Sequence, residues 1–90
     1  MTRAQALAEM NALPGIIASF ERETGEYRVT LRFGPLPGGR GAQEWMHKRR
    51  EAVASYSDDK ADALATARDM SARWEAMTPA QRDHLYRHPA

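Results

Sequence analysis

Apolar and polar residues alternate on both sides of Thr24-Gly25, and this is the clearest pattern in the chain. A period of two is typical of strands with one buried face, so residues 15–33 are predicted to form a β-hairpin. The apolar row consists of Ile16, Ala18, Phe20, Tyr27, Val29, Leu31 and Phe33. A two-residue loop at Thr24-Gly25 would place Phe20 opposite Val29 and Glu21 opposite Arg28, which keeps the two faces distinct.

A second pattern, with helical spacing, covers residues 58–77. Its apolar stripe consists of Ala61, Leu64, Ala67, Met70, Ser71, Trp74 and Met77. We expect Ser57 to cap this long helix, with Asp58 and Asp59 placing negative charge at the positive end of the helix dipole. Because two strands alone are marginal in water, the stripe is expected to cover the apolar row of the hairpin.

Capping signals predict a short helix near each end of the chain. Residues 2–13 begin with Thr2, which Gln5 can answer in a capping box, and Pro14-Gly15 follows as a stop signal. The apolar stripe expected for this helix is Leu7, Ala8 and Met10.

The last helix is expected from Pro79 to Arg87. Thr78 provides its cap, Pro79 suits the first helical position and Gln81 can close a second capping box. Leu85 is its only strong apolar anchor.

Residues 43–56 fit either a helix or a strand. A helix would place Trp45, Arg49, Ala52, Val53 and Tyr56 on one face, whereas the end of the segment also alternates as a strand does. We favour a third strand over residues 51–56, because the hairpin needs a further partner. Residues 34–41 hold four glycines and two prolines and predict a loop.

The 90 residues, 42% hydrophobic and 28% charged, have the composition of an ordinary globular protein. We expect one α+β domain over residues 1–90, with an antiparallel sheet of two or three strands packed against the helix at 58–77. The absence of cysteine excludes disulfides and thiolate metal sites. No apolar run reaches the length of a signal peptide or a membrane span, so a cytoplasmic location and no membrane partner are expected.

Basic residues are concentrated in one run although the formal net charge is only +1. His47-Lys48-Arg49-Arg50 is continuous, and Arg40 lies in the preceding loop. Such a run is typical of a solvated face, of a protein contact or of a phosphate contact, with Trp45 or Tyr56 available to stack on a base. The balanced charge favours a protein partner over nucleic acid.

The outer face of the hairpin is the other candidate surface, since a solvated face and a partner-binding face share this polar composition. Together the two surfaces give the residues expected to bind a partner: Glu21, Arg28, Arg32, Arg40, Trp45, Lys48, Arg49 and Arg50. An exposed strand edge has unpaired backbone groups, so pairing of two copies as a homodimer is a further alternative.

No grouping of residues indicates catalysis. His84 and His88 have the spacing of a two-histidine metal site, but no third ligand recurs at a diagnostic distance. The aspartates at 58, 59 and 62 lack the calcium-loop pattern, and the glycine-rich loop lacks the lysine that ends a phosphate-binding loop. We therefore expect no metal, no cofactor and no enzymatic activity.

One resemblance rests on the order of motifs. Tyr27–Leu31, then Gly34–Gly38, then Ser55–Asp58 and the helix at Ala61–Ala67 resemble the strand, loop, strand and helix of HicB-type antitoxins, which neutralise an RNase toxin. The chain departs from that family by an extra segment at 42–50 and by lacking a DNA-binding region. The helix–strands–helix order is also similar to double-stranded-RNA-binding domains, but the basic start of their last helix is replaced by Ser57-Asp58-Asp59.

A small α+β domain without cysteine or a catalytic grouping also resembles, in kind, the phage-encoded anti-CRISPR inhibitors. These share no motif, so the resemblance carries no residue across. It implies a protein that binds and blocks a bacterial defence effector, such as a nucleoprotein complex, inside the host cell. A nucleic-acid-binding or antitoxin module is the alternative.

Overall fold

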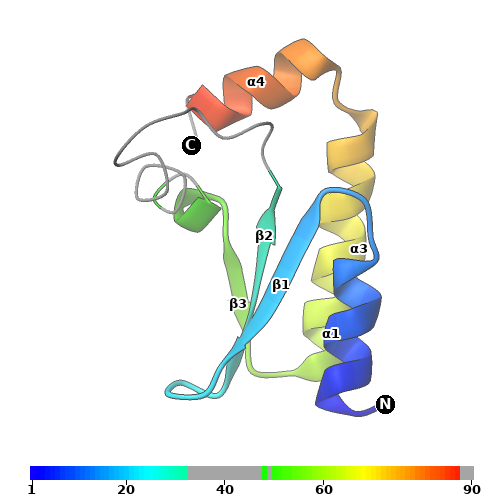
Figure 1. The fold of residues 1–90 in the computed structure, drawn as a ribbon, viewed down its shortest axis with the longest axis vertical. Coiled ribbons are helices and arrows are strands. Elements are labelled where there is room, and N and C mark those ends of the chain that lie inside the picture. Colours follow the sequence, from blue (N-terminus) through cyan, green and yellow to red (C-terminus); the bar gives the residue numbers. More distant parts are fainter. Residues whose placement is uncertain (33–47, 49, 88–90) are drawn as a thin grey trace.

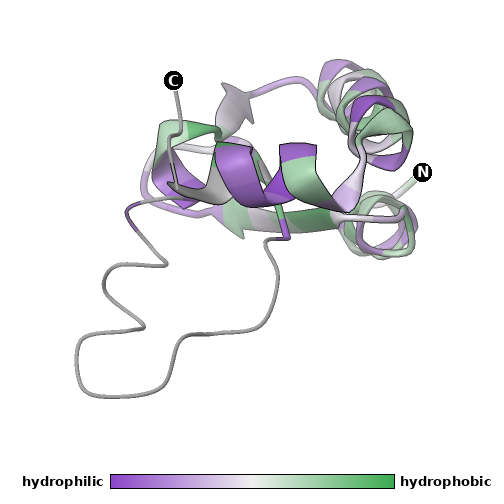
Figure 2. Ribbon diagram, turned by 90° about the horizontal axis from the view of Figure 1, so that it is seen from above, coloured by the Kyte–Doolittle hydropathy of each residue, from purple (hydrophilic) through white to green (hydrophobic). Residues whose placement is uncertain are grey.

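A three-stranded antiparallel sheet in the order β1-β2-β3 lies at the centre of the computed structural model, which describes residues 1–32, 48 and 50–87 (Figure 1). The strands are β1 (Ile16–Glu21), β2 (Glu26–Leu31) and β3 (Ser55–Ser57). Two helices, α1 (Arg3–Asn11) and α3 (Lys60–Ala76), lie side by side against one face of the sheet (Figure 2). The last helix, α4 (Pro79–Arg87), turns back across the top of the view in Figure 1. The predicted α+β class, with the long helix packed on the sheet, is confirmed.

The core lies between the sheet and the two helices. Its buried apolar residues are Ala6, Met10, Ile16, Ala18, Tyr27, Val29, Leu31, Ala63, Leu64 and Ala67. Phe20 is half-buried at the margin, where its ring meets the edge of Tyr27 with 5.1 Å between centroids. The predicted apolar row is therefore the inward face, except that Phe33 lies outside the described residues.

The hairpin register differs from the prediction by two residues. Phe20 pairs with Tyr27 rather than Val29, so the loop is four residues long. A two-residue loop of the favoured types needs a positive φ at its first residue, where β-branched Thr24 would stand. Gly25 is the loop residue with a positive φ, of 72°. Because the shift is even, every side chain keeps its predicted face.

The start of α1 follows the prediction. Gln5 N–H donates to the Thr2 hydroxyl at 3.1 Å and the Gln5 side chain accepts from Thr2 N–H at 2.8 Å, which completes the capping box. The buried stripe, however, is Ala6 and Met10, while Ala8 is exposed.

The cap of α3 differs from the prediction. Asp59, not Ser57, is the N-cap, and its carboxylate accepts from the N–H of Asp62 at 2.8 Å. The helix starts two residues later than expected because Ser57 is still paired in β3. Ala61 is exposed and Ala63 is buried in its place. The rest of the predicted stripe is buried or half-buried: Leu64, Ala67, Met70, Ser71, Trp74 and Met77.

The third strand is present but shorter than predicted. Only Ser55–Ser57 pairs with β2, and residues 50–52 are helical instead of extended. Ala54 N–H donates to the carbonyl of Glu51 at 3.1 Å, and this bond closes the turn that leads into the strand.

The start of α4 follows the prediction as well. Thr78 N–H donates to the Gln81 side chain at 2.8 Å, and Gln81 N–H donates back to the Thr78 hydroxyl at 3.2 Å. Leu85 is half-buried against the core.

Candidate functional site

The face of the sheet opposite α1 and α3 carries the candidate site, and we call it the second face. Alternation along the paired strands assigns to it Ile17, Ser19, Arg28, Thr30 and Arg32, with Tyr56 beside Arg28 in the register. The predicted partner-binding residues Arg28 and Arg32 are therefore on one face. Arg32 is exposed there, just beyond the end of β2.

Residues 50–53 cover part of this face, which was predicted to be open to solvent. Thr30 is fully buried, and its hydroxyl donates to the carbonyl oxygen of Arg50 at 2.6 Å. Val53 packs against the core from the same segment. The prediction of a solvated outer face is thus wrong at Thr30, because a segment some twenty residues away in sequence folds over it.

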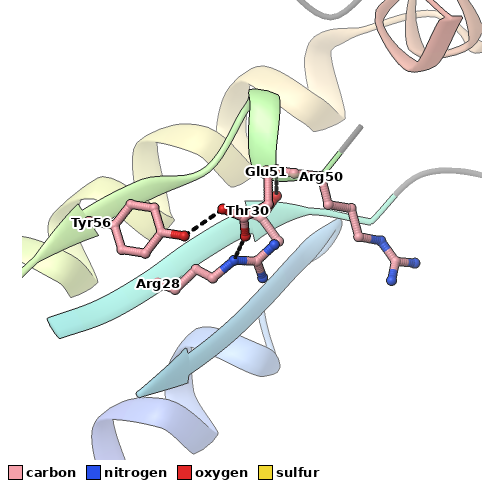
Figure 3. A network of polar contacts seen from close by, with 5 residues as sticks. All are labelled: Arg28, Thr30, Arg50, Glu51 and Tyr56. Carbon is pink, nitrogen blue, oxygen red and sulfur yellow. Dashed lines mark hydrogen bonds and ion pairs between the residues drawn. The ribbon is translucent and has the colours of Figure 1, made fainter. Parts of the chain in front are cut away.

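Glu51 is the centre of the polar network on the second face (Figure 3). Arg28 Nε donates to one oxygen of its carboxylate, and the Tyr56 hydroxyl donates to the other at 2.6 Å. The Arg28 side chain is only 11% exposed and that of Glu51 35%, so this ion pair is better shielded from solvent than an ordinary surface pair. The network joins three segments: β2, the helical residues 50–52 and β3.

The predicted pairing of Glu21 with Arg28 is wrong. In the observed register Glu21 stands opposite Glu26, and Arg28 stands opposite Ser19. Glu21 is exposed at the loop end of β1, away from the Arg28–Glu51 pair. It therefore lies at the rim of the second face.

Tyr56 is the exposed aromatic residue of the network, with 46% of its surface accessible. The hydrogen bond from its hydroxyl to Glu51 raises the pKa of Tyr56 above its ordinary value of 10.0, because the bond exists only while the phenol keeps its proton. Desolvation and the negative charge of Glu51 raise the pKa further, while Arg28 acts in the opposite sense. The ring is held in place while one side remains accessible.

Of the predicted basic run, the structure describes Lys48 and Arg50, which come just before Glu51 in the chain. Lys48 is exposed and Arg50 is half-buried. The Arg50 side chain extends away from Glu51 in Figure 3, and its Nε is buried without a hydrogen-bond partner. The expected contacts Arg40, Trp45 and Arg49 lie outside the described residues.

Glu51 and Thr30 are the residues that the sequence did not reveal. A single glutamate after a run of four basic residues carries no signal for a partner more than twenty positions earlier. The alternation of the strand places Thr30 on the outer face, as expected. It is buried because residues 50–53 fold over it.

The acidic groups suggested for a cation have structural partners. Asp59 caps α3, and Asp62 accepts a hydrogen bond from the Ser57 hydroxyl at 2.8 Å. Within residues 1–32, 48 and 50–87, no three histidine or acidic side chains are grouped as metal ligands. In the same ranges no helix has both the length and the apolar character needed to span a bilayer.

Comparison of the chain with protein-family models, with curated proteins and with solved structures finds no match.

Proposed function

We propose that this protein is a non-enzymatic binding protein whose second face docks on the acidic surface of another macromolecule. The observation that supports this most strongly is the Arg28–Glu51–Tyr56 network, which presents an exposed tyrosine in a fixed orientation. Tyrosine and arginine are enriched among the residues that dominate binding energy at interfaces. A side chain that is already ordered loses less conformational entropy on binding.

The charge around Tyr56 supports an acidic partner. Exposed Arg32 lies on the second face, exposed Lys48 and half-buried Arg50 precede Glu51 in the chain, and Arg28 neutralises the Glu51 carboxylate. Complementary charge of this kind accelerates association and selects among partners more than it adds affinity.

The partners of three carboxylates support a binding role over acid–base chemistry. Glu51 accepts from Arg28 and Tyr56, Glu9 pairs with Arg68 at 2.6 Å, and Asp59 caps a helix. Each of these carboxylates is held by a structural partner, whereas a general acid or base must lie within hydrogen-bond reach of a substrate.

The partner class that we propose is a nucleoprotein effector of a bacterial defence system, of the CRISPR-Cas type. This part of the proposal depends on the resemblance in kind to phage-encoded anti-CRISPR inhibitors, and it places the protein in the cytoplasm of the host cell. Such complexes hold anionic nucleic acid in positively charged channels, and we assign the second face to an acidic patch on the protein component. We assign the second face to an acidic protein surface rather than to the nucleic acid itself, because the formal net charge of the chain is only +1 and nucleic-acid affinity usually depends on bulk positive charge.

The test is stoichiometric inhibition of purified CRISPR-type effector complexes in a DNA-cleavage assay. We expect cleavage by a susceptible complex to stop once the inhibitor equals the complex in concentration, and phage plaquing to be restored in cells that express the protein. The Lys48→Glu/Arg32→Glu variant should lose at least about tenfold in potency, a loss of about 1.4 kcal/mol.

The matched control is Arg22→Glu/Arg73→Glu, which changes the net charge equally at exposed residues of the β1–β2 loop and α3. Equal potency of both variants would remove the second face from the proposal. Full cleavage with a representative set of effector complexes would contradict an effector partner. Direct, steeply salt-dependent binding to DNA or RNA oligonucleotides would favour the nucleic-acid-binding alternative.

A further inference from the structure

Two arginine side chains of the second face have no counter-ion in the described part of the chain. Arg32 is exposed and Arg50 is half-buried. The Arg28 guanidinium pairs with Glu51, whereas neither Arg32 nor Arg50 forms a side-chain hydrogen bond or ion pair among residues 1–32, 48 and 50–87. These two guanidinium groups therefore carry positive charge that no described carboxylate balances.

The fold attaches the two arginines at neighbouring points of the second face. The carbonyl oxygen of Arg50 accepts from the Thr30 hydroxyl at 2.6 Å, so the backbone of Arg50 lies over Thr30. Arg32 follows Thr30 on the same face, about 7 Å further along the strand. Its N–H donates to the Gly15 carbonyl at 2.7 Å, which extends the pairing of the hairpin to this residue. Because the Arg50 side chain extends away from Glu51, toward the end of β2 in Figure 3, one ligand at this end of the face is within reach of both side chains.

Arg50 Nε is the one side-chain nitrogen or oxygen atom of the described residues that is buried without a hydrogen-bond partner. Buried polar groups in native proteins are nearly always paired, so an unpaired donor calls for an explanation. The backbone of the same residue is fully used, since its carbonyl accepts from Thr30 and also from the Val53 N–H at 3.3 Å. The fold thus depends on the backbone of Arg50 and leaves the guanidinium available to a ligand.

Two guanidinium groups without a counter-ion select an oxyanion. Guanidinium is a planar fork of N–H donors that keeps its charge and has no acceptor, and a carboxylate matches the fork with two parallel hydrogen bonds. Proteins that bind a nucleic-acid backbone neutralise several phosphates, whereas this chain has a formal net charge of only +1. A single carboxylate therefore fits the two arginines better than a row of phosphates does.

We propose that Arg32 and Arg50 together bind one carboxylate, the side chain of an aspartate or glutamate on the acidic partner surface. The Arg50 side chain rotates so that Nε and one Nη donate to the carboxylate, which pairs the donor that is unpaired in the free protein. Arg32 donates to the same group from the strand. The source of the carboxylate rests on the proposed function, whereas the site itself is testable without a partner.

Acetate is the probe for the site, and the Nε–H signals of the arginines in proton–nitrogen NMR spectra of the full chain are the readout. When acetate replaces chloride at constant ionic strength, the Arg50 signal should shift saturably, with half-saturation on the order of 50 mM. Exchange of this hydrogen with water should slow, because it becomes hydrogen-bonded. An Arg50 signal that acetate leaves in place would overturn the proposal.

Arg32→Gln and Arg22→Gln form a matched pair of variants, since both remove one charge from an exposed side chain. Arg32→Gln should weaken acetate binding at Arg50 at least about threefold, whereas Arg22→Gln, in the β1–β2 loop, should leave it nearly unchanged. Arg50→Lys keeps the charge and the backbone bond to Thr30 but removes the planar fork, so binding followed at the Arg32 signal should weaken at least about threefold. Equal effects of the two glutamine variants would overturn the shared site, and this pair decides the matter even if Arg50→Lys fails to fold.

Dimethyl phosphate, which has the same charge as acetate, tests nucleic acid as the other source of an oxyanion. We expect it to bind no more tightly than acetate, and binding at least about tenfold tighter would overturn the carboxylate assignment. The cleavage assay separates this inference from the proposed function. Acetate binding at the two arginines together with full cleavage would support the site and contradict an effector partner, whereas inhibition that Arg32→Gln/Arg50→Lys leaves at full potency would overturn the site as the partner's anchor.

Discussion

The indole ring of Trp74 lies directly over Gly15, so close that a Cβ atom at Gly15 would stand 2.6 Å from Cγ of the ring. Gly15 also has a φ of 75°, a backbone conformation that residues with a side chain rarely adopt. Gly15 therefore allows the chain to turn from α1 into β1 and allows Trp74 of α3 to pack directly against that turn. The Ser71 hydroxyl reinforces the contact by donating to the carbonyl of Pro14 at 2.7 Å.

Replacement of Gly15 by alanine should lower the free energy of unfolding by about 2–4 kcal/mol. About 1–2 kcal/mol comes from the left-handed conformation, and the remainder from overpacking against the indole. Gly25→Ala is the matched control, because its φ is 72° but no atom lies within 4 Å of the added Cβ. Urea unfolding of both variants measures the difference, and equal losses would show that the Trp74 contact contributes nothing.

Arg82 attaches α4 to the rest of the fold through contacts with the same tryptophan, Trp74. Its guanidinium lies 3.7 Å from the centroid of the Trp74 ring, and Nε donates to the Trp74 carbonyl at 3.0 Å. Arg82→Ala should therefore loosen α4 and cost about 1–2 kcal/mol of stability.

Hydrogen exchange localises this effect, since amides of α4 should lose protection while those of β2 keep theirs. Arg73→Ala provides the comparison, because its ion pair with Asp69 spans one exposed helical turn and contributes at most about 0.5 kcal/mol. Unchanged protection of α4 in the Arg82 variant would contradict the attachment.

Local signals in the sequence were sufficient for the starts of the first and last helices and for the two faces of the hairpin. The capping boxes at Thr2 and Thr78 formed as predicted, because each involves residues three positions apart. The faces of the hairpin were also predicted correctly, since a register shift of two residues leaves every side chain on the same face. The register was not predicted correctly, because the length of the turn depends on whether Thr24 can adopt a positive φ.

The candidate site required contacts that no local pattern encodes. Arg28 and Glu51 are 23 positions apart, and their pairing depends on the path of the chain after β2. Ser57 was predicted as a helix cap, but tertiary pairing with Tyr27 keeps it in the sheet and transfers the cap to Asp59. In both cases long-range pairing outweighs a local preference.

Glu51→Gln should destabilise the protein by about 1–3 kcal/mol, because it leaves the mostly buried Arg28 guanidinium without its counter-ion. Tyr56→Phe removes a single hydrogen bond from the same carboxylate and should cost about 1 kcal/mol. If the three residues act as one network, the double variant will lose less than the sum of the single losses. Additive losses in chemical denaturation would show that the two bonds are independent.

The raised pKa of Tyr56 makes stability depend on pH in the alkaline range. Its hydroxyl donates to Glu51 only while protonated, so the folded state holds this proton more tightly than the unfolded state does. The stabilisation is fully present below pH 10 and is lost as pH rises through the folded-state pKa. Ultraviolet titration of the phenolate should show one tyrosine that ionises above the ordinary value of 10.0 in the wild type. Glu51→Gln should lower this pKa, because it removes the negative charge and leaves one neutral carboxamide oxygen, a weaker acceptor, in place of the carboxylate. An unchanged titration in that variant would contradict Glu51 as the cause.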